Sequence, residues 1–284
     1  MFDVSNYFLM FIILVITIYP FWYIFVVSFN EGGDAARGGI YFWPRVFSLD
    51  NYRAVFSNSS LTDAFIVTIA KTVIGTVIHV LFTGIIAYAF TCKDLIFKKF
   101  YMIFGTITMF FGGGLIPTYL LIKNIHLRNS FWVYIIPVAF SFWDMIIMLS
   151  FFKTLPEELS ESARIDGAGD LRIFWSVIIP LSAPIIATIA LFSGVAQWND
   201  FFTGVMYISN SKLLPIQTVL YKIIAESQAS AMLATLPNNI ADRKITSDSI
   251  KLATMVVSTV PIMCIYPFLQ KYFVKGMLIG SVKG

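Results

Sequence analysis

The sequence predicts an all-α integral membrane protein with six transmembrane helices. Hydrophobic residues make up 58% of the chain and charged residues only 13%, whereas soluble domains contain roughly 45–50% apolar and about 25% charged residues. The mean hydropathy is +0.79, and several apolar runs approach the length of about 20 residues that a helix needs to cross a bilayer. These observations exclude a disordered chain, a disulfide scaffold and a secreted enzyme, and the small net charge of +4 argues against a nucleic-acid-binding protein.

Six apolar stretches define the expected spans of a single transmembrane domain covering residues 1–284. They are residues 8–29, 64–91, 100–122, 131–152, 177–208 and 250–273. The first is expected to be a retained helix, because its apolar run is longer than that of a signal peptide and no Lys or Arg precedes it. The second and fifth exceed the minimum length, so we expect them to tilt or to project beyond the bilayer.

The distribution of Lys and Arg favours an orientation with both termini in the cytosol. In that orientation the inner segments are shorter and therefore denser in basic residues than the outer ones. Two long polar loops, residues 30–63 and 209–249, then face outside. Loops of this length usually carry function or structure of their own, and Pro215 predicts a short helix within the second. Docking of a partner and a simple solvated connection are both compatible with these loops.

The cytosolic connection of residues 153–176 is patterned for helix. Thr154-Leu155-Pro156-Glu157 fits a capping box, in which the hydroxyl and the carboxylate satisfy each other's free backbone donors. Gly167 suits the left-handed position that ends a helix, and a second short helix is expected over 171–175. Helices this short need a packing surface. A lipid headgroup layer is one candidate, but the glutamate-rich face favours a soluble partner protein.

The residues of this connection resemble the EAA loop of ABC-importer permeases. The matching residues are Glu161-Ser162-Ala163-Arg164-Ile165-Asp166-Gly167-Ala168, then Phe174 and Ile179-Pro180-Leu181-Ser182-Ala183-Pro184, preceded by Leu155-Pro156-Glu157-Glu158-Leu159. Ser162 stands where alanine is usual. Further segments are similar to the carbohydrate branch and its maltose-permease-G-like subunits, notably those for oligosaccharides and polysaccharide fragments: Phe111–Tyr119, Trp198–Phe202 and Leu214–Gln217.

The resemblance implies a type I importer permease fold in a bacterial cytoplasmic membrane, with the loop's first helix acting as a coupling helix. It implies as partners a second, non-identical permease, two ATPase subunits that use ATP and Mg²⁺, and an extracellular solute-binding protein that delivers the carbohydrate. The ATPase-coupling residues that it implies are Glu157, Glu158, Glu161, Ser162, Ala163, Arg164, Asp166, Gly167 and Ala168. The chain itself is expected to bind no cofactor or metal and to be no enzyme, since it has no phosphate-binding G-x-x-x-x-G-K-[ST] loop.

Polar residues inside the predicted spans are candidates for a sugar pathway, because polar side chains rarely face lipid. The candidates are Trp143, Asp144, Gln197, Trp198, Asn199 and Asp200. Hydrogen bonding between packed helices is the alternative role for these residues, and it is favoured for His79, which with Lys71 is a weaker candidate. Helix-breaking residues at 112–117 and the pair Pro180/Pro184 predict interruptions of the kind found in transporters.

Two other functional classes stay open at this point. An ion-coupled secondary transporter would need buried carboxylates near the midplane and often inverted repeats; the sequence offers Asp144 and Asp200 and no evident repeat. A membrane-embedded enzyme would need a clustered acid–base or metal set, which two separated histidines do not supply. The secondary transporter is therefore the main alternative to an ATP-driven importer.

Overall fold

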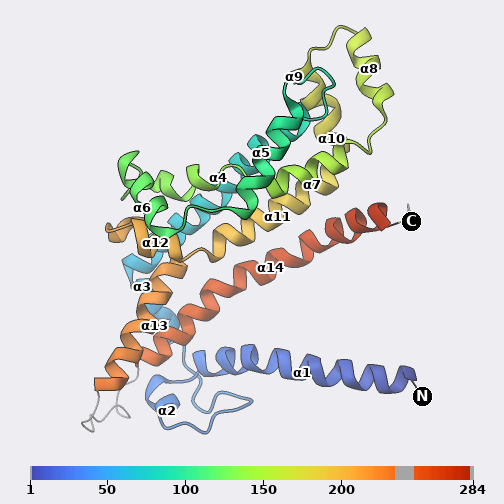
Figure 1. The fold of residues 1–284 in the computed structure, drawn as a ribbon. Helices are drawn as coiled ribbons and strands as arrows, with labels where there is room; N and C mark the ends of the chain where they lie inside the picture. Colours follow the sequence, from blue (N-terminus) through green and yellow to red (C-terminus); the bar gives the residue numbers. More distant parts are fainter. Residues whose placement is uncertain (1, 234–245, 282–284) are drawn as a thin grey trace. The chain divides into compact units, whose positions relative to one another are not determined.

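The computed structural model describes residues 2–233 and 246–281, with side chains described for residues 2–226, 246–265 and 267. Every regular element within these residues is helical (Figure 1). Part of the predicted outer loop 209–249, residues 234–245, lies outside the described residues. The chain divides into two compact units. Unit one comprises Met1–Phe65 and Pro215–Met263, and unit two comprises Ile66–Leu214 and Cys264–Gly284.

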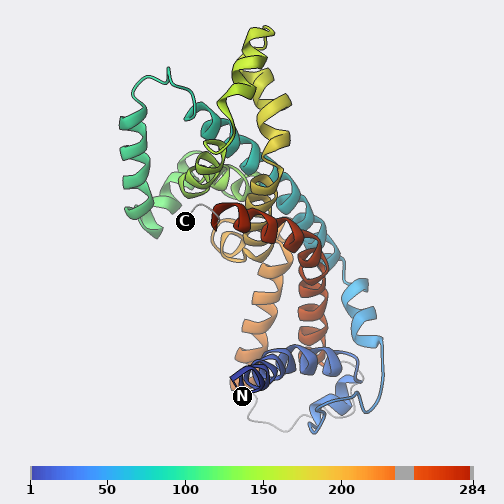
Figure 2. The same cartoon turned by 90° about the vertical axis from the view of Figure 1, so that its right-hand side faces the viewer.

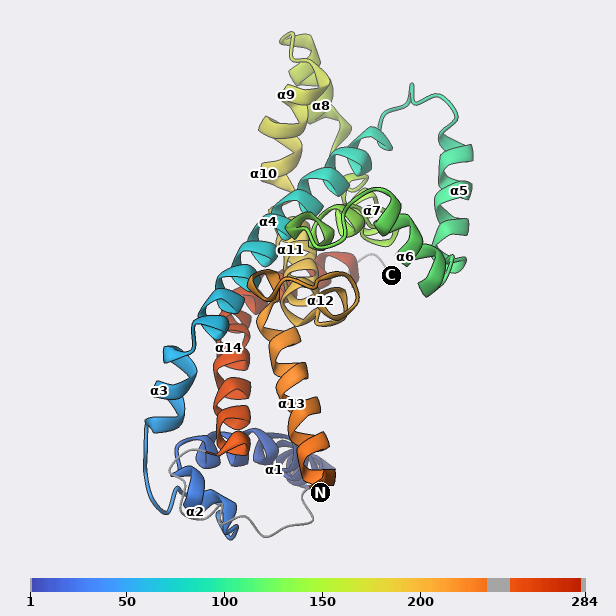
Figure 3. The same cartoon turned by 90° about the vertical axis from the view of Figure 1, so that its left-hand side faces the viewer.

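Unit one contains long helices. Its elements are α1 (Phe2–Ser28), α2 (Gly32–Ala36), α3 (Asp50–Ser57), α13 (Ile216–Leu233) and the first residues of α4 (Ser59–Ala89) and α14 (Ser247–Ser281). The buried residues of its apolar clusters lie at the end of α1, on α3 and the loop before it, and at the starts of α4, α13 and α14. Helix α13 and the start of α14 run side by side (Figures 2 and 3). Ile216, Ala253 and Val55 are buried together there. The helix that Pro215 predicts is therefore present, as the start of the longer α13.

Unit two contains most of the shorter helices around one core. Its further elements are α5 (Lys98–Phe110), α6 (Leu115–Asn124), the 3-10 turns η1 (Phe131–Tyr134) and η2 (Ile136–Val138), α7 (Phe142–Phe152), α8 (Glu157–Ile165), α9 (Asp170–Ile173), the π-helical turn η3 (Phe174–Ile178), α10 (Ile179–Leu181), α11 (Ala183–Asn199), α12 (Phe202–Tyr207) and the 3-10 turn η4 (Ser211–Leu213). Met145, Met148, Phe174 and Ile189 are the centre of its apolar core. Helix α8 lies at the end of this unit, beyond α9 and α10 (Figure 1).

Within the described residues, three helices are long and apolar enough to cross a membrane: α1, α4 and the Ser247–Ile265 part of α14. Three bent pairs pass the same test together: α5 with α6 at 115°, η1–η2 with α7 at 51°, and α9–α10 with α11 at 84°. If each bent pair is one span, the number rises to six. Figure 3 shows the sharp bend between α5 and α6. The six regions overlap the six stretches that the sequence predicts.

Two helix interruptions lie where glycine and proline predict them. Two others were not predicted, the bend between η2 and α7 and a break at Asp200. Gly112 to Gly114 separate α5 from α6, and Gly114 has a φ of +81°, which favours glycine. The second interruption falls at Ser182, between Pro180 and Pro184. The stretch 177–208 is interrupted again at Asp200, whose backbone is extended between α11 and α12. Neither proline nor glycine marks this last break, which is why the sequence did not predict it.

Candidate functional site

Unit two contains an open cavity of about 650 Å³ whose wall combines aromatic rings with polar side chains. That volume is typical of a small-molecule site. Its lining residues come from α4, α6, η1, η2, α7, α11 and α12 and the residues beside them. They are His79, Thr118, Ile122, Val133, Tyr134, Pro137, Val138, Phe140, Ser141, Asp144, Phe192, Ser193, Ala196, Gln197, Asp200, Phe202, Thr203 and Tyr207. Residues with hydroxyl, amide and carboxylate groups therefore line the same space as several aromatic residues.

An ion pair joins the broken end of α11 to α4. The side chain of Lys71 is fully buried, and its Nζ donates to the carboxylate Oδ2 of Asp200 at 3.2 Å and to the carbonyl oxygen of Asp200 at 3.0 Å. The other carboxylate oxygen, Oδ1, accepts from the backbone N–H of Thr203 at 3.1 Å, at the start of α12. The ammonium also lies 4.9 Å from the centroid of the Tyr134 ring, within cation–π range. The pair is neutral as a whole and holds the break in place.

A second pair, His79 with Asp144, carries one shared proton. His79 Nδ1 lies 2.8 Å from the carbonyl oxygen of Val138, and His79 Nε2 lies 3.0 Å from Asp144 Oδ2. A carbonyl oxygen only accepts, so Nδ1 donates to it. Nε2 and Oδ2 can form a hydrogen bond only if one of them carries a proton. Either the ring is protonated and the carboxylate is charged, or the ring is neutral and the carboxyl group is protonated. The pair is therefore neutral overall, like the Lys71–Asp200 pair. Ser141 fixes the start of α7 by accepting from the Asp144 N–H at 3.2 Å.

Gln197 ties α11 to the turn η1 in the wall of the same cavity. Its side chain is 5% exposed, and Nε2 donates to the Tyr134 carbonyl oxygen at 2.9 Å. Gly75 on α4 lies directly behind it, because a Cβ added at Gly75 would lie only 2.5 Å from Gln197 Nε2. Close approach of α4 and α11 at this level thus depends on glycine at position 75.

The structure brings together three of the six predicted pathway residues. Asp144, Gln197 and Asp200 line the cavity. Within the described part of the chain, Trp143, Trp198 and Asn199 are not among its lining residues; Trp143 is 62% exposed and Trp198 is buried. His79 and Lys71, ranked as weaker candidates, prove to be the partners of the two carboxylates. Tyr134 was missed, and only its position within an apolar span containing aromatic residues could have indicated it.

The connection between α7 and α9 is the second candidate site, and its helix ends as predicted. Gly167 has a φ of +80°. Its N–H donates to the Arg164 carbonyl oxygen at 3.0 Å, and the Ala168 N–H donates to the Ala163 carbonyl oxygen at 2.9 Å. These two bonds form a Schellman motif, which satisfies the carbonyl groups left free at a helix end. Helix α8 is thus a separately terminated unit that runs from Glu157 to Ile165.

The start of α8 differs from the predicted capping box. Thr154 Oγ1 donates backward to the Phe151 carbonyl oxygen at 2.7 Å, and the Glu157 carboxylate accepts from Lys93 Nζ at 2.6 Å. Pro156 is the residue before the helix and makes no side-chain cap. The prediction was wrong because a cation on the loop after α4 competes for the same carboxylate. The hydrogen bond from Lys93, followed by its charge, holds the pKa of Glu157 below its ordinary value.

The solvent side of this connection carries both charge and uncovered apolar surface. Arg164 Nη2 pairs with Asp170 Oδ1 at 3.0 Å and links α8 to α9. The hydrogen bond to Asp170 raises the pKa of the Arg164 guanidinium. Ile165 is 86% exposed and Leu171 69% exposed, whereas Ala163 packs toward the unit's core. Helices α8 and α9 are thus linked by an ion pair, and each leaves an apolar side chain exposed.

Of the other predicted coupling residues, Glu158, Glu161, Ser162 and Asp166 lie on α8 or at its end, and Ala168 follows Gly167. Among the described residues, no group of three or more His, Cys, Asp or Glu side chains could hold a metal ion. Each site instead contains two pairs that join a basic to an acidic residue: Lys71–Asp200 and His79–Asp144 in the cavity wall, and Lys93–Glu157 and Arg164–Asp170 at the α8 connection.

Comparison with known proteins places these features in a family context. A family model described as "Binding-protein-dependent transport system inner membrane component" matches residues 2–279. Protein LplC of Bacillus subtilis (strain 168) is 40% identical over 284 residues, which cover 100% of this chain and 95% of that relative. The polygalacturonan/rhamnogalacturonan transport system permease protein YtcP of the same organism is 37% identical over 284 residues, covering 100% and 99% of the two chains.

A solved structure shares the fold. A chain in the crystal structure of a bacterial ABC transporter involved in the import of the acidic polysaccharide alginate matches with a TM-score of 0.87 and 28% sequence identity. The match covers 96% of this chain and 96% of that chain. The similarity therefore extends over nearly all of the helices described above.

Proposed function

Because this chain belongs to the family of binding-protein-dependent transport system inner membrane components, we propose that it is one of two non-identical permease subunits of an ATP-driven carbohydrate importer. Members of this family are membrane permeases, not themselves catalytic, that work with further permease, ATPase and solute-binding components. The substrate we propose is an oligosaccharide or a polysaccharide fragment, handed over by an extracellular solute-binding protein. We place the chain in a bacterial cytoplasmic membrane with both termini in the cytosol.

Energy coupling is assigned to the α8 connection. Helix α8 has its own ion pair at the start, its own Schellman motif at the end, and apolar side chains that the described chain leaves uncovered, above all Ile165. A helix held in this way can transmit a rigid-body movement that a flexible loop would absorb. We propose that α8 docks on an ATPase subunit and that ATP-driven closure of the ATPase pair moves the attached helices. The observation that carries the proposal is this helix with fixed ends and an uncovered apolar side chain at Ile165.

The sugar pathway is assigned to the cavity of unit two. Asp144, Gln197 and Asp200 present acceptor and donor groups there, and Tyr134 and Tyr207 present rings. Sugars need both kinds of contact, since their hydroxyl groups form hydrogen bonds and their C–H faces stack on rings. Because each charged pair in the wall is neutral overall, the polar groups can bind hydroxyl groups without a strong preference for ions.

The coupling assignment is tested by purifying the assembled transporter with a substituted α8. Ile165→Asp places a charge on the proposed docking surface and should abolish co-purification of the ATPase subunits while the chain still inserts. Phe56→Asp is the matched control, because Phe56 is 63% exposed on α3 in the other unit. If the ATPase subunits co-purify with Ile165→Asp as well as they do with wild type, α8 is not the docking element.

A further inference from the structure

A loop rich in aromatic residues follows the short helix α2 in unit one and leaves three consecutive rings exposed. Tyr41, Phe42 and Trp43 are 61%, 63% and 74% exposed. The residue before them, Ile40, is buried against Val26 at the end of α1. One side chain thus fixes the loop to the helix while the next three turn outward.

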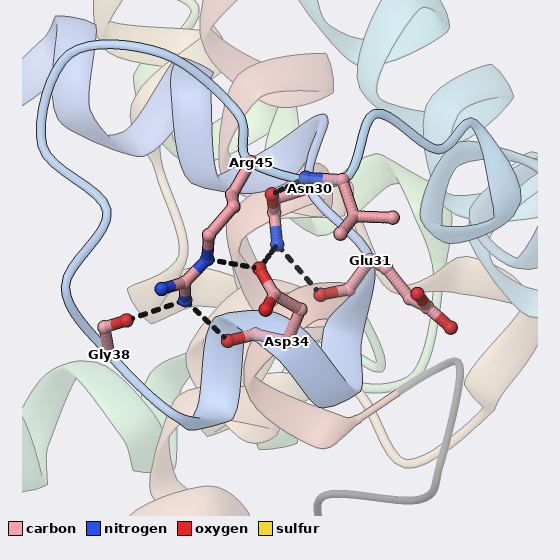
Figure 4. Close-up of polar contacts among 6 residues, drawn as sticks. Asn30, Glu31, Asp34, Gly38 and Arg45 are labelled. Carbon is pink, nitrogen blue, oxygen red and sulfur yellow. Dashed lines mark hydrogen bonds and ion pairs between the residues drawn. The ribbon is translucent and has the colours of Figure 1, made fainter.

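Buried polar contacts hold this loop in one conformation (Figure 4). Asn30 is fully buried; its Nδ2 donates to Asp34 Oδ2 at 2.9 Å, and its Oδ1 accepts from the Val46 N–H at 2.8 Å. Arg45 Nε donates to the same Asp34 oxygen at 3.0 Å, and Arg45 Nη2 donates to the Gly38 carbonyl oxygen at 2.8 Å. The hydrogen bond from Asn30, and then that from Arg45, lowers the pKa of Asp34. Both ends of the loop are therefore fixed.

The loop folds back along α1 and does not extend beyond it. Trp22 Nε1 donates to the Phe42 carbonyl oxygen at 3.0 Å. The rings of Trp22 and Trp43 meet edge to face with centroids 5.7 Å apart, and those of Tyr19 and Phe42 lie 5.9 Å apart. The aromatic residues of the loop therefore lie at the level of residues 19–22, although the helix continues to Ser28.

Helix geometry converts this position into a depth. The 27 residues of α1 rise about 1.5 Å each and span about 40 Å, close to the thickness of a bilayer including its headgroups. Trp22 precedes Ser28 by six residues, or about 9 Å of rise. A hydrocarbon core of about 30 Å centred on this helix begins about 5 Å from the helix end. The level of Trp22 is therefore about 4 Å on the acyl-chain side of the boundary with the headgroups. Tryptophan and tyrosine are enriched at this boundary because their rings are apolar and their N–H and O–H groups are polar.

We propose that the loop Gly38–Phe47 is a lipid-binding anchor whose Tyr41, Phe42 and Trp43 insert into the headgroup boundary of one leaflet. The occupant is lipid because the loop is continuous with α1, whose apolar window is only 11% buried, and because its three consecutive exposed side chains are all aromatic. Arg45 and Asn30 satisfy backbone groups that would otherwise be unpaired at this depth. The proposal requires only that α1 crosses the membrane.

Site-directed spin labelling of the complete transporter in phosphatidylethanolamine/phosphatidylglycerol vesicles tests this depth. The label replaces Trp43 (Trp43→Cys) or, as the matched control, Arg37 (Arg37→Cys), with Cys92→Ser and Cys264→Ser as background. Collision with oxygen, which dissolves in lipid, is compared with collision with a water-soluble nickel chelate. We expect position 43 to favour oxygen and position 37 to favour nickel, and Arg45→Gln to reduce the difference between them.

Two results would overturn the proposal. If position 43 collides with nickel as freely as position 37, the loop lies in water. If position 43 is shielded from both reagents, another protein covers the loop. Tyr41→Cys gives an independent reading should Trp43→Cys fail to assemble, because Tyr41 is similarly exposed on the same loop.

Discussion

The two candidate sites of unit two use charged residues in opposite ways. In the cavity wall, the side chain of Lys71 is 0% exposed and that of Asp200 26% exposed. At the α8 connection, the paired side chains of Lys93 and Glu157 are 77% and 69% exposed. The buried pair is the longer of the two, at 3.2 Å against 2.6 Å, so the shorter contact is the one that water surrounds.

Burial determines what each pair contributes. A buried charge that loses its partner cannot recover its hydration, so the loss of one residue is strongly destabilising. An exposed pair exchanges its partner for water with little change in stability. The cavity pairs should therefore control whether the protein folds, whereas the α8 connection should affect coupling and leave stability nearly unchanged. The following predictions test this difference, in order of the expected change in stability.

Asp200→Asn should cause the largest loss of stability. It leaves the fully buried Lys71 ammonium without its carboxylate, and breaking a buried pair in this way costs about 3–5 kcal/mol. Reduced yield and an earlier thermal transition of the purified transporter would show this. The double variant Lys71→Met/Asp200→Asn, which removes both charges, should recover much of the loss. A single variant as stable as wild type would mean that the pair is hydrated.

Gly75→Ala should destabilise the same region by an intermediate amount. The added methyl group would displace the Gln197 amide from the Tyr134 carbonyl oxygen, and a buried group left unpaired costs about 1–3 kcal/mol. Gly194→Ala is the matched control on α11, since its Cβ would lie 3.5 Å from Thr76 Oγ1, an ordinary contact. Thermal melting of the two variants should separate them; equal transitions would contradict the close packing of α4 on α11.

Gly167→Val should block transport with a smaller effect on stability. A side chain at a φ of +80° costs about 1–2 kcal/mol, and relief of that strain would distort the end of α8. Gly169→Val is the control, because Gly169 has an ordinary φ of −75° and a Cβ added there would meet no atom within 4 Å. Uptake by cells should be lost only in the first variant while both reach the membrane. Normal uptake by Gly167→Val would remove the basis for a rigid coupling helix.

Glu157→Gln should have the smallest effect on stability, and that effect should depend on pH. The Glu157 pKa is lowered in the folded protein by Lys93. The pair therefore contributes fully above the ordinary glutamate pKa of about 4.3, and its contribution is lost as the pH falls through the lowered value. The melting temperatures of wild type and variant should differ slightly at neutral pH and converge in acid. A difference that grows on acidification would contradict this ion pair.

Local features of both sites could be predicted from the sequence. Gly167 predicted the end of α8 because the left-handed position favours glycine whatever surrounds it. Pro180 and Pro184 predicted the interruption before α11 because proline lacks the N–H that a helix interior requires. The apolar runs predicted where the chain can cross a membrane, since hydrocarbon excludes polar side chains regardless of the fold.

Contacts between distant segments were decided only by the tertiary structure. Asp200 was predicted as a polar residue in a span. Its partner Lys71 is 129 residues away along the chain, and nothing in the sequence indicates that the two side chains meet. His79 was expected to form hydrogen bonds between packed helices, and it does so, but only the folded chain identifies Asp144 as its partner and places both in a cavity wall. Thr154 and Glu157 fit a local capping pattern that is not formed, because Lys93, brought close by folding, binds the carboxylate. Patterns that depend on a few neighbouring residues are thus determined by sequence, whereas the pairing of charges depends on which helices meet.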